Sequence, residues 1–170
     1  MALLPIRTYP DPVLAQKCRP IDQVDQDIRR LAEEMAETMY DAPGVGLAAP
    51  QVGRPIRLIV VDTAEGEQRG NPMMLVNPEI LEAEGELVFN EGCLSVPDYT
   101  ADVHRAARVK VQARDLDGKP VHIEAEGLLS VCLQHEIDHL DGRLFIDRIS
   151  QLKRSMYRKR RLKQLRREGS

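Results

Sequence analysis

Residues 128–140 read LLSVCLQHEIDHL, and this stretch decides the predicted architecture because it specifies a largely buried helix. Its apolar residues stand at positions 128, 129, 132, 133, 137 and 140, and Gly142 just beyond them is a good helix stop. His135 and His139 are four residues apart, so on a helix they stand one turn apart on the same face. Two imidazoles in this arrangement can bind one metal ion, and Glu136 can reach a water on that metal. The stretch therefore predicts a metal site in a cleft.

The motif at residues 135–139 also has an ordinary structural interpretation. Both histidines can be partly buried helix residues and Glu136 a solvated charge, and the motif by itself leaves the two interpretations open. A catalytic metal site needs a third protein ligand and an open position. The acids downstream of the motif are Asp141, Asp147 and Glu168. The first lies off the shared helix face, the last belongs to a basic tail, and Asp147 stays a weak alternative.

Cys93 is the better candidate for the third ligand. It stands in residues 90–97, NEGCLSVP, where Gly92 permits a tight backbone and Pro97 is expected to stop regular structure. A small buried thiol is the common alternative role of a free cysteine. The residue taken alone favours packing, so other motifs must decide.

The remaining pattern predicts an α+β fold. A helix with Asp25 as its cap is expected at residues 25–40 and a mostly charged helix at residues 150–167. Strands are expected at residues 57–62, 74–81, 86–90, 109–113 and 121–125. We therefore expect antiparallel or mixed β-sheets packed around a central metal-binding helix, with a C-terminal helix. Residues 1–150 are expected to form the catalytic domain, and residues 151–170 a basic C-terminal helix of the same single domain.

Length and composition are those of an ordinary globular protein of 170 residues. No apolar run is long enough for a membrane span, and Pro5 interrupts an N-terminus without the layout of a secretory signal. We therefore expect a cytoplasmic location. Cys18, Cys93 and Cys132 are odd in number and widely spaced, which argues against a disulfide framework in a reducing compartment.

The charge is unevenly distributed along the chain. Residues 153–170 contain nine Lys or Arg and one acid, whereas the other 152 residues contain 15 bases and 26 acids. The net charge of −3 thus divides into +8 on the tail and −11 on the body. A basic helix of this kind can simply be a solvated surface, and the charge pattern alone leaves that interpretation open. The acidic body would discourage indiscriminate binding to RNA.

Three segments together resemble the signature motifs of one family. They are residues 44–51 (GVGLAAPQ), 91–95 (EGCLS) and 134–139 (QHEIDH). The first matches neither a dinucleotide fingerprint nor a phosphate loop. In order and spacing the three are similar to the motifs of peptide deformylases, and the likeness runs from residues 10–14 to the basic C-terminal helix. This resemblance covers nearly the whole chain.

The resemblance implies a role for each matched residue. Cys93, His135 and His139 are expected to bind the metal, with a water in the fourth position, and Glu136 to act as general base and then acid. Gln51 and the backbone N–H of Leu94 are expected to stabilise the oxyanion. The residues expected to bind substrate are Gly46 in the groove and Val45, Phe89, Leu128, Val131 and Cys132 in a methionine side-chain pocket.

The implied activity is removal of the N-terminal formyl group from formyl-methionine of nascent polypeptides, with release of formate. One divalent metal ion is expected, Fe²⁺ in cells, with Zn²⁺ or another divalent ion as a substitute. Formyl-methionyl nascent peptides are the expected partners, the basic helix is expected to dock on the ribosome, and no membrane is involved. Some family members have an arginine after the Cys-Leu-Ser motif, where this chain has Thr100 in residues 98–101 (DYTA). Arg105 matches a later family arginine, for which a structural role is expected.

Three rival interpretations differ from this one in the role of the metal, in the substrate or in the role of Glu136. A thiol amidase would use Cys93 as a nucleophile with a histidine base, and would keep its activity without metal. A true endopeptidase would cleave internal peptide bonds of unformylated substrates. A ribosome- or RNA-binding module would hold a closed structural metal with four protein ligands, and replacing Glu136 would leave its function intact.

Overall fold

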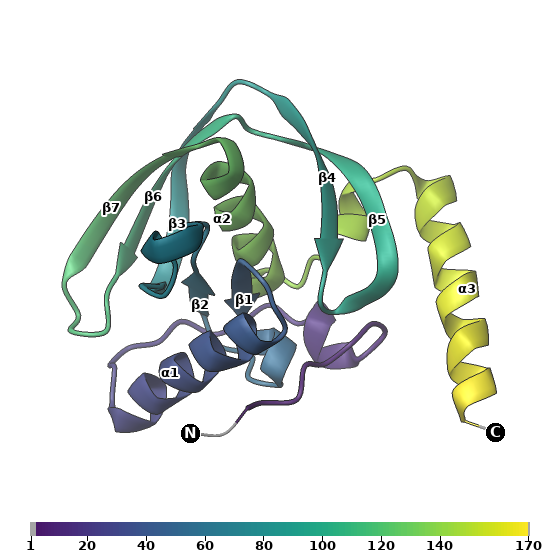
Figure 1. The fold of residues 1–170 in the computed structure, drawn as a ribbon, viewed down its shortest axis with the longest axis horizontal. Coiled ribbons are helices and arrows are strands. Elements are labelled where there is room, and N and C mark those ends of the chain that lie inside the picture. The colour runs from purple at the N-terminus through teal and green to yellow at the C-terminus, as the bar shows by residue number, and fades with distance from the viewer. Residues whose placement is uncertain (1–2, 170) are drawn as a thin grey trace.

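The structure is a computed structural model of the chain, and it describes residues 3–169 (Figure 1). The main elements in chain order are α1 (Gln26–Asp41), β1 (Gly46–Ala48), β2 (Leu58–Val61), β3 (Met73–Glu84), β4 (Leu87–Cys93), β5 (Val96–Arg105), β6 (Arg108–Arg114), β7 (Pro120–Glu126), α2 (Gly127–Leu140) and α3 (Gln151–Glu168). In the described part of the chain, the strands form a five-stranded antiparallel sheet in the order β1-β2-β3-β6-β7 and a separate two-stranded antiparallel sheet, β4-β5. The predicted α+β architecture is confirmed.

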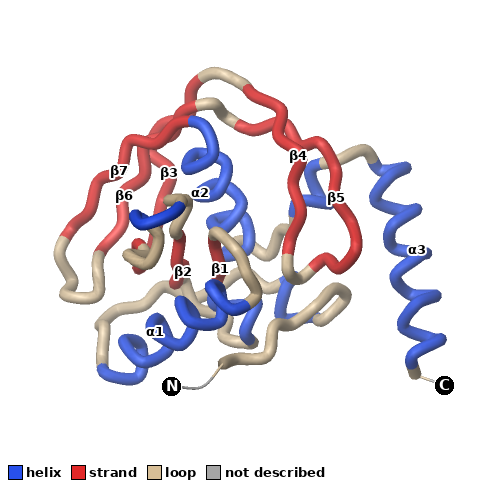
Figure 2. The backbone as a smooth tube through the Cα atoms, viewed as in Figure 1, coloured by secondary structure: helices blue, strands red, loops and turns tan. Residues whose placement is uncertain are grey.

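Helix α2 lies between the two sheets (Figure 2). It contacts β1, β2, β3, β6 and β7, and its apolar side chains, including Leu133 and Ile137, join a core with the inward side chains of the five-stranded sheet. The strands β6 and β7 alternate buried and exposed residues, as expected of a sheet with one solvated face. This core holds the helix that carries the histidine motif.

Strand β2 is buried on both faces. Ile59 and Val61 point into the core with α2, whereas Leu58 and Val60 pack in a second core against α1. This explains why its sequence, Leu-Ile-Val-Val, is continuously apolar instead of alternating. Helix α1 begins after Asp25, whose side chain accepts a hydrogen bond from the backbone N–H of Ile28, as the predicted N-cap requires.

A third core joins β5 to the C-terminal part of the chain. It contains Val103 of β5, Phe145 of a short 3₁₀ helix (Phe145–Arg148) and Tyr157 of α3. Helix α3 is further held by Arg161, which donates to the backbone carbonyl of Tyr9. The C-terminal helix therefore packs against the rest of the molecule beside β5 (Figure 1).

Two strands were missed from the sequence, and the prediction for Pro97 was wrong. Strand β5 was not predicted, and Pro97 lies inside it instead of ending regular structure. The β4-β5 register shifts between the pairs Gly92↔Thr100 and Cys93↔Val96, so Pro97 falls where no ladder hydrogen bond is required of it. The short strand β1 was also missed, because its three residues, Gly-Leu-Ala, are too few to show alternation. None of the helices in residues 3–169 has the length and apolarity needed to cross a membrane.

Candidate active site

Two elements converge to bring three metal-ligating side chains together. Cys93 ends β4, and His135 and His139 stand one turn apart on α2. The Cys93 Sγ atom lies 3.4 Å from His139 Nε2, which lies 3.3 Å from His135 Nε2. Their ligand atoms all lie within 4.8 Å of one another. The structure thus brings together the three residues predicted as metal ligands.

Glu91 orients the imidazole of His135 through the ring nitrogen that does not face the other two ligands. Its Oε1 accepts a hydrogen bond from His135 Nδ1 at 2.8 Å, and its two oxygens also pair with Arg105 at 2.7 and 2.9 Å. Burial alone would raise the pKa of Glu91, but the hydrogen bonds from Arg105 and His135 outweigh it and hold the pKa below its usual value. Because an ionised carboxylate only accepts, Nδ1 carries the proton and Nε2 offers its lone pair to the centre of the cluster.

A buried ion-pair network continues under α2. Arg105 also binds Asp138 at 2.6 Å, and Asp138 in turn pairs with Arg148 at 2.5 and 2.7 Å. Asp138 is 7% exposed and Arg105 4% exposed. These contacts hold Arg105 between two carboxylates, which agrees with the structural role expected for it.

The three side chains fit a divalent transition-metal ion. One thiolate and two neutral imidazoles are the donors that Zn²⁺ and Fe²⁺ accept. Burial lowers the pKa of His139 well below its usual value, which favours the neutral form that a ligand needs. Burial also acts to lower the pKa of His135, but Glu136, Cys93 and Glu91 raise it, so a metal ion must displace a proton from this imidazole when it binds. The weak alternative, Asp147, instead accepts a hydrogen bond from the Leu144 N–H at 2.9 Å and lies outside the cluster.

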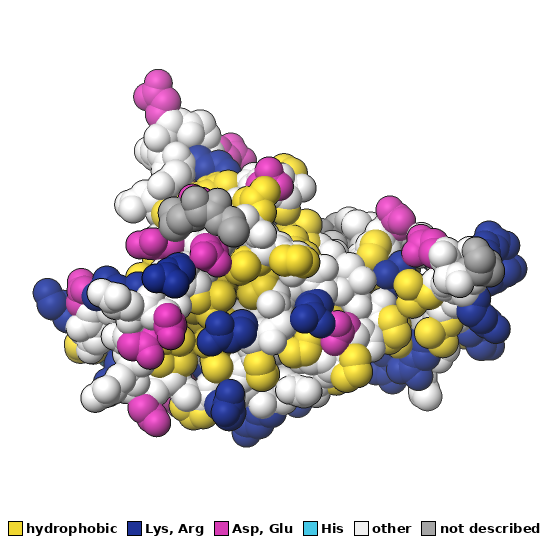
Figure 3. All heavy atoms as spheres, turned by 90° about the horizontal axis from the view of Figure 1, so that it is seen from below, with side chains coloured by type: hydrophobic (Ala, Val, Ile, Leu, Met, Phe, Trp, Pro, Cys, Tyr) yellow, Lys and Arg dark blue, Asp and Glu magenta, His cyan; other side chains and the backbone are white. Residues whose placement is uncertain are grey.

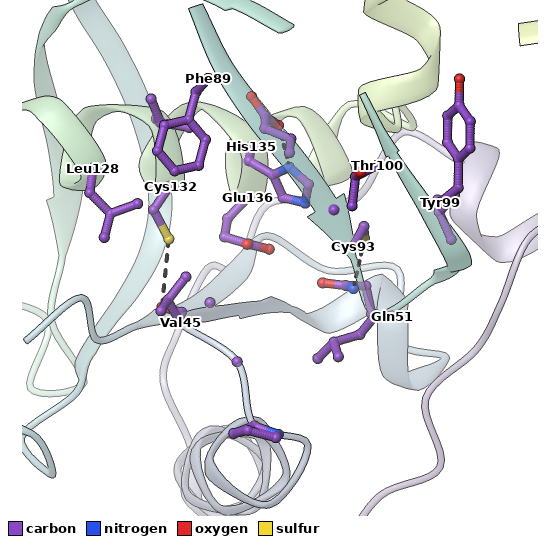
Figure 4. Close-up of a pocket in the computed structure, with 18 of the residues that line it drawn as sticks. Val45, Gln51, Phe89, Cys93, Tyr99, Thr100, Leu128, Cys132, His135 and Glu136 are labelled. Atoms are coloured by element: carbon purple, nitrogen blue, oxygen red, sulfur yellow. Dashed lines mark hydrogen bonds and ion pairs between the residues drawn. The ribbon is translucent and has the colours of Figure 1, made fainter. Parts of the chain in front are cut away.

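Glu136 points into the cavity beside the cluster (Figure 4). It is 4% exposed, and its Oε1 atom has no hydrogen-bond partner in the described structure. Burial raises the pKa of Glu136 to about 7, although the adjacent His135 acts in the opposite direction. A buried carboxyl oxygen without a hydrogen-bond partner lowers the stability of the fold. Such groups are often found at functional sites.

Gln51 and Leu94 line the cavity beside Cys93. Gln51 Oε1 accepts from the Ala48 N–H at 2.9 Å, and its Nε2 donates to Ser95 Oγ at 3.0 Å and faces Cys93 Sγ at 3.6 Å. These contacts fix the amide with its N–H groups toward the thiol. Leu94 follows Cys93 directly and lines the same cavity.

The cavity has a volume of about 550 Å³ and an apolar end. Val131 and Cys132 form its buried part, and Cys132 Sγ lies 3.6 Å from the Val45 carbonyl. Val45, Phe89 and Leu128 stand at its mouth and remain 38–41% exposed (Figure 4). All the residues predicted to bind substrate therefore line one cavity: Val45, Gly46, Phe89, Leu128, Val131 and Cys132.

Two residues of this site were missed from the sequence. Glu91 and Ser95 hold His135 and Gln51 in place, although neither was assigned a role. Both belong to the segment 91–95 that had been recognised, and Glu91 stands two residues before the thiol ligand. Residues two apart on a strand share a face, and this signal could have identified Glu91.

An α+β fold with a Cys-His-His cluster and an unpartnered carboxylate in a cleft defines a metal-dependent hydrolase. The family model described as polypeptide deformylase matches residues 3–155. The chain is 55% identical to a peptide deformylase of Alkalilimnicola ehrlichii over 169 residues, covering 99% of this chain and 94% of that relative. The chain belongs to the polypeptide deformylase family, and its activity is the removal of the N-terminal formyl group from nascent peptides.

Other comparisons agree with this assignment. A peptide deformylase of Mesorhizobium japonicum is 54% identical over 157 residues, covering 92% of this chain and 89% of that relative. The crystal structure of a peptide deformylase from Legionella pneumophila superimposes with a TM-score of 0.89 at 47% identity, covering 97% of this chain and 98% of that one. The structure from Ehrlichia chaffeensis in complex with actinonin gives 0.91 at 39% identity, covering 96% and 98%. The Cys-His-His metal site is typical of the family.

Proposed function

We propose that Cys93, His135 and His139 hold a single divalent ion and that Glu136 performs the proton transfers of deformylation. The observation that carries this assignment is the convergence of the three ligand atoms within 4.8 Å, beside a buried carboxyl oxygen that has no other partner. When bound, a divalent ion lowers the pKa of a water and polarises the carbonyl of the substrate. Glu136 accepts the proton of the attacking water and delivers it to the departing amine nitrogen.

Gln51 and the Leu94 N–H stabilise the negative charge that develops on the formyl oxygen. The fixed orientation of the Gln51 amide supports this role, because its bonds to Ala48 and Ser95 leave it no need to reorganise during the reaction. Removing one such donor typically costs about 10²–10³-fold in rate. We infer the same range for Gln51→Leu.

The apolar end of the cavity receives the methionine side chain of the substrate. Burying a methionine side chain there contributes roughly 1.5–3 kcal/mol of binding free energy. The close approach of Gly46 to Glu136 supports a tight wall near the reacting carbon. Because a formyl carbon carries only hydrogen, such a wall accepts formyl and excludes acetyl and larger acyl groups. The proposed pocket residues are Val45, Phe89, Leu128, Val131 and Cys132.

For the ion itself we propose Fe²⁺ in cells, with Zn²⁺ as a substitute. The donor set suits both, and the affinity order alone favours zinc at equal availability. Iron is proposed because the family resemblance implies it, and iron beside a thiolate is readily oxidised. Protein purified without oxygen should contain iron by elemental analysis, and exposure to air should lower both its iron content and its activity.

The basic helix α3 is proposed to dock on the ribosome, where formylated chains emerge in the cytoplasm. Positive side chains gather over α3 in Figure 3. Its buried residues, Tyr157 and Arg161, support the proposal that residues 151–170 belong to the same domain as residues 1–150. Replacing the exposed Lys159, Lys163 and Arg166 by glutamine should reduce co-sedimentation with ribosomes at low salt and leave hydrolysis of a small substrate unchanged. Undiminished co-sedimentation would contradict docking.

The site assignment is tested by measuring formate release from formyl-Met peptides. Glu136→Ala should reduce turnover by at least about 10²–10⁴-fold while the protein retains its metal. A chelator should abolish the activity of the unaltered protein, and a divalent ion should restore it. Activity that survives complete metal removal would favour Cys93 as a nucleophile instead.

A further inference from the structure

One wall of the cavity is formed by a short segment that contains two glycines. Pro43, Gly44, Val45 and Gly46 all line the cavity. Gly46 has to lack a side chain, because a Cβ there would stand 2.5 Å from Glu136 Oε2 and 2.9 Å from Cys132 Sγ. Gly46 is paired with Val61 in the sheet, whereas Gly44 precedes β1 and has more backbone freedom. The N–H of Gly44 donates to the Met39 carbonyl at 2.7 Å, which leaves its own carbonyl to be held by another group.

Arg69 restrains the wall from outside the cavity. Its Nη2 donates to the Gly44 carbonyl at 2.6 Å, and its Nη1 donates to the Asp62 carbonyl at 2.9 Å. Its guanidinium also lies 4.8 Å from the centre of the Tyr40 ring. One side chain therefore connects the wall to the end of β2 and to the last turn of α1.

Asp62 organises the loop that presents Arg69. Its carboxylate, which is buried, accepts hydrogen bonds from the Tyr40 hydroxyl, from the Gly70 N–H at 2.9 Å and from the Ala64 N–H at 3.0 Å. Its own N–H donates to the Val45 carbonyl at 2.8 Å. The loop from 62 to 70 is thus closed on itself and tied to the wall at both ends.

None of these three polar side chains lines the cavity or contacts a metal ligand. Arg69, Asp62 and Tyr40 nevertheless contact the wall segment or each other through a short, continuous set of hydrogen bonds. We propose that Arg69 is a positioning residue, which holds Gly44–Gly46 in the conformation that meets the peptide backbone of the substrate, while Asp62 and Tyr40 hold Arg69. This inference rests on the proposed placement of the substrate in the cavity.

Loss of Arg69 should weaken substrate binding and leave the rate of the chemical step unchanged. Without Arg69 the wall must be ordered when the substrate binds, and fixing the backbone of one residue corresponds to a factor of about 5–30 in affinity. Glu136 and the metal ligands keep their positions, because α2 and β4 do not depend on Arg69. We therefore expect KM to rise and kcat to stay within about twofold.

The decisive experiment measures kcat and KM of the metal-loaded, full-length chain on a formyl-Met tripeptide and on formyl-Met amide. Arg69→Ala should raise KM about 5–30-fold for the tripeptide and less for the short substrate. Arg69→Lys, which keeps one donor, should recover part of the loss. Tyr40→Phe removes only the hydroxyl that binds Asp62 and should give an intermediate rise.

Arg29→Ala is the matched control. Arg29 also donates to a backbone carbonyl, that of Leu116 at 2.9 Å, and pairs with the carboxylate of Asp117, but it lies outside the cavity lining. Its removal should leave KM unchanged. In hydrogen exchange, the amides of residues 44–48 should exchange faster in Arg69→Ala than in Arg29→Ala.

A KM for Arg69→Ala equal to that of Arg29→Ala would overturn the inference, and so would a fall in kcat at constant KM. Failure of the underlying site assignment gives a different result. If the substrate does not occupy this cavity, Gly46→Ala leaves KM and kcat unchanged, as do the Arg69 and Tyr40 variants. If only the role proposed for Arg69 is wrong, Gly46→Ala still impairs the reaction, and only the Arg69 and Tyr40 variants leave KM unchanged.

Discussion

Glu91 and His135 are joined by a hydrogen bond of 2.8 Å between Oε1 and Nδ1, in the interior of the protein. Glu91 stands two residues before Cys93 on β4, so the two side chains share one face of the strand. One short stretch of strand therefore supplies both a metal ligand and the group that orients a second ligand on α2.

Removing the charge of Glu91 should weaken metal binding. Glu91→Gln leaves Arg105 with Asp138 as its ionised partner and no longer enforces the tautomer of His135. Such changes typically cost about 10–100-fold in metal affinity. Competition with a chelator measures the affinity. Glu86→Gln is the control, because Glu86 binds His104 Nδ1 in the same way on the surface, at 2.6 Å. Equal affinities of the two variants would contradict the role of Glu91.

A methyl group at position 46 should nearly abolish turnover. In Gly46→Ala, the new Cβ would stand 2.5 Å from a carboxyl oxygen of Glu136, so the wall or the catalytic side chain must move. Displacements of about 1 Å can cost about 10²-fold in rate. Gly169→Ala is the control, because position 169 lies outside the cavity lining and its Cβ would stand 3.3 Å from the Leu165 carbonyl. Steady-state formate release compares them, and equal rates would refute the prediction.

Arg105 should contribute far more to the free energy of unfolding than an exposed arginine does. Arg105→Ala leaves the carboxylates of Glu91 and Asp138 buried without their shared partner, which costs about 3–5 kcal/mol in the free energy of unfolding. Arg108→Ala removes only an exposed pair with Glu84, and should cost less than about 1 kcal/mol. Urea unfolding with chelator present makes this comparison without the contribution of metal binding. Similar losses in the two variants would show that the buried network contributes little.

Asp62 should stabilise the fold above pH 4 and lose this effect in acid. Burial opposes its ionisation, but the hydrogen bonds from Tyr40, Gly70 and Ala64, with Arg69 nearby, hold its pKa below the ordinary value of about 3.9. Tyr40, whose pKa burial and Asp62 raise to about 12, remains a neutral donor throughout. Because the pKa of Asp62 is lower in the folded than in the unfolded state, its stabilising effect is complete above the unfolded-state pKa. The effect is lost as the pH falls through the folded-state pKa.

The measurement for this prediction is urea unfolding of the unaltered chain and of Asp62→Asn between pH 7 and pH 3. The difference in unfolding free energy should be constant near neutrality and shrink below about pH 4. A difference that stays the same over the whole range would mean that the carboxylate charge is irrelevant.

The sequence was sufficient for features with a local cause. The positions of His135 and His139 on one face follow from helical periodicity alone, and the cap at Asp25 follows from its side chain. By contrast, Cys93 reaches the histidines across 42 and 46 residues, and no local rule places it there. The family resemblance made that prediction possible.

What could not be predicted depends on partners that are distant in the sequence. Glu91 resembles any surface acid until Arg105 and His135 are found beside it. Strand β5 was missed because Pro97 is normally a strand breaker, and only the irregular pairing at the start of β5 makes it acceptable. The proposed positioning role of Arg69 could not be predicted, because Arg69 lies in a polar loop with no local pattern that points to its partners.

The ligands of the metal site belong to two separately packed cores. Helix α2 is embedded in the core of the five-stranded sheet, whereas Cys93 packs with the third core around Phe145 and Tyr157. A cation held by all three side chains is therefore a cross-link between two halves of the molecule, much as a disulfide would be. Metal-depleted protein still has the buried Glu91–His135 and Arg105–Asp138 bonds between the two halves, so it should stay folded. Its cleft should nevertheless be more mobile and should be the first place that a protease cuts.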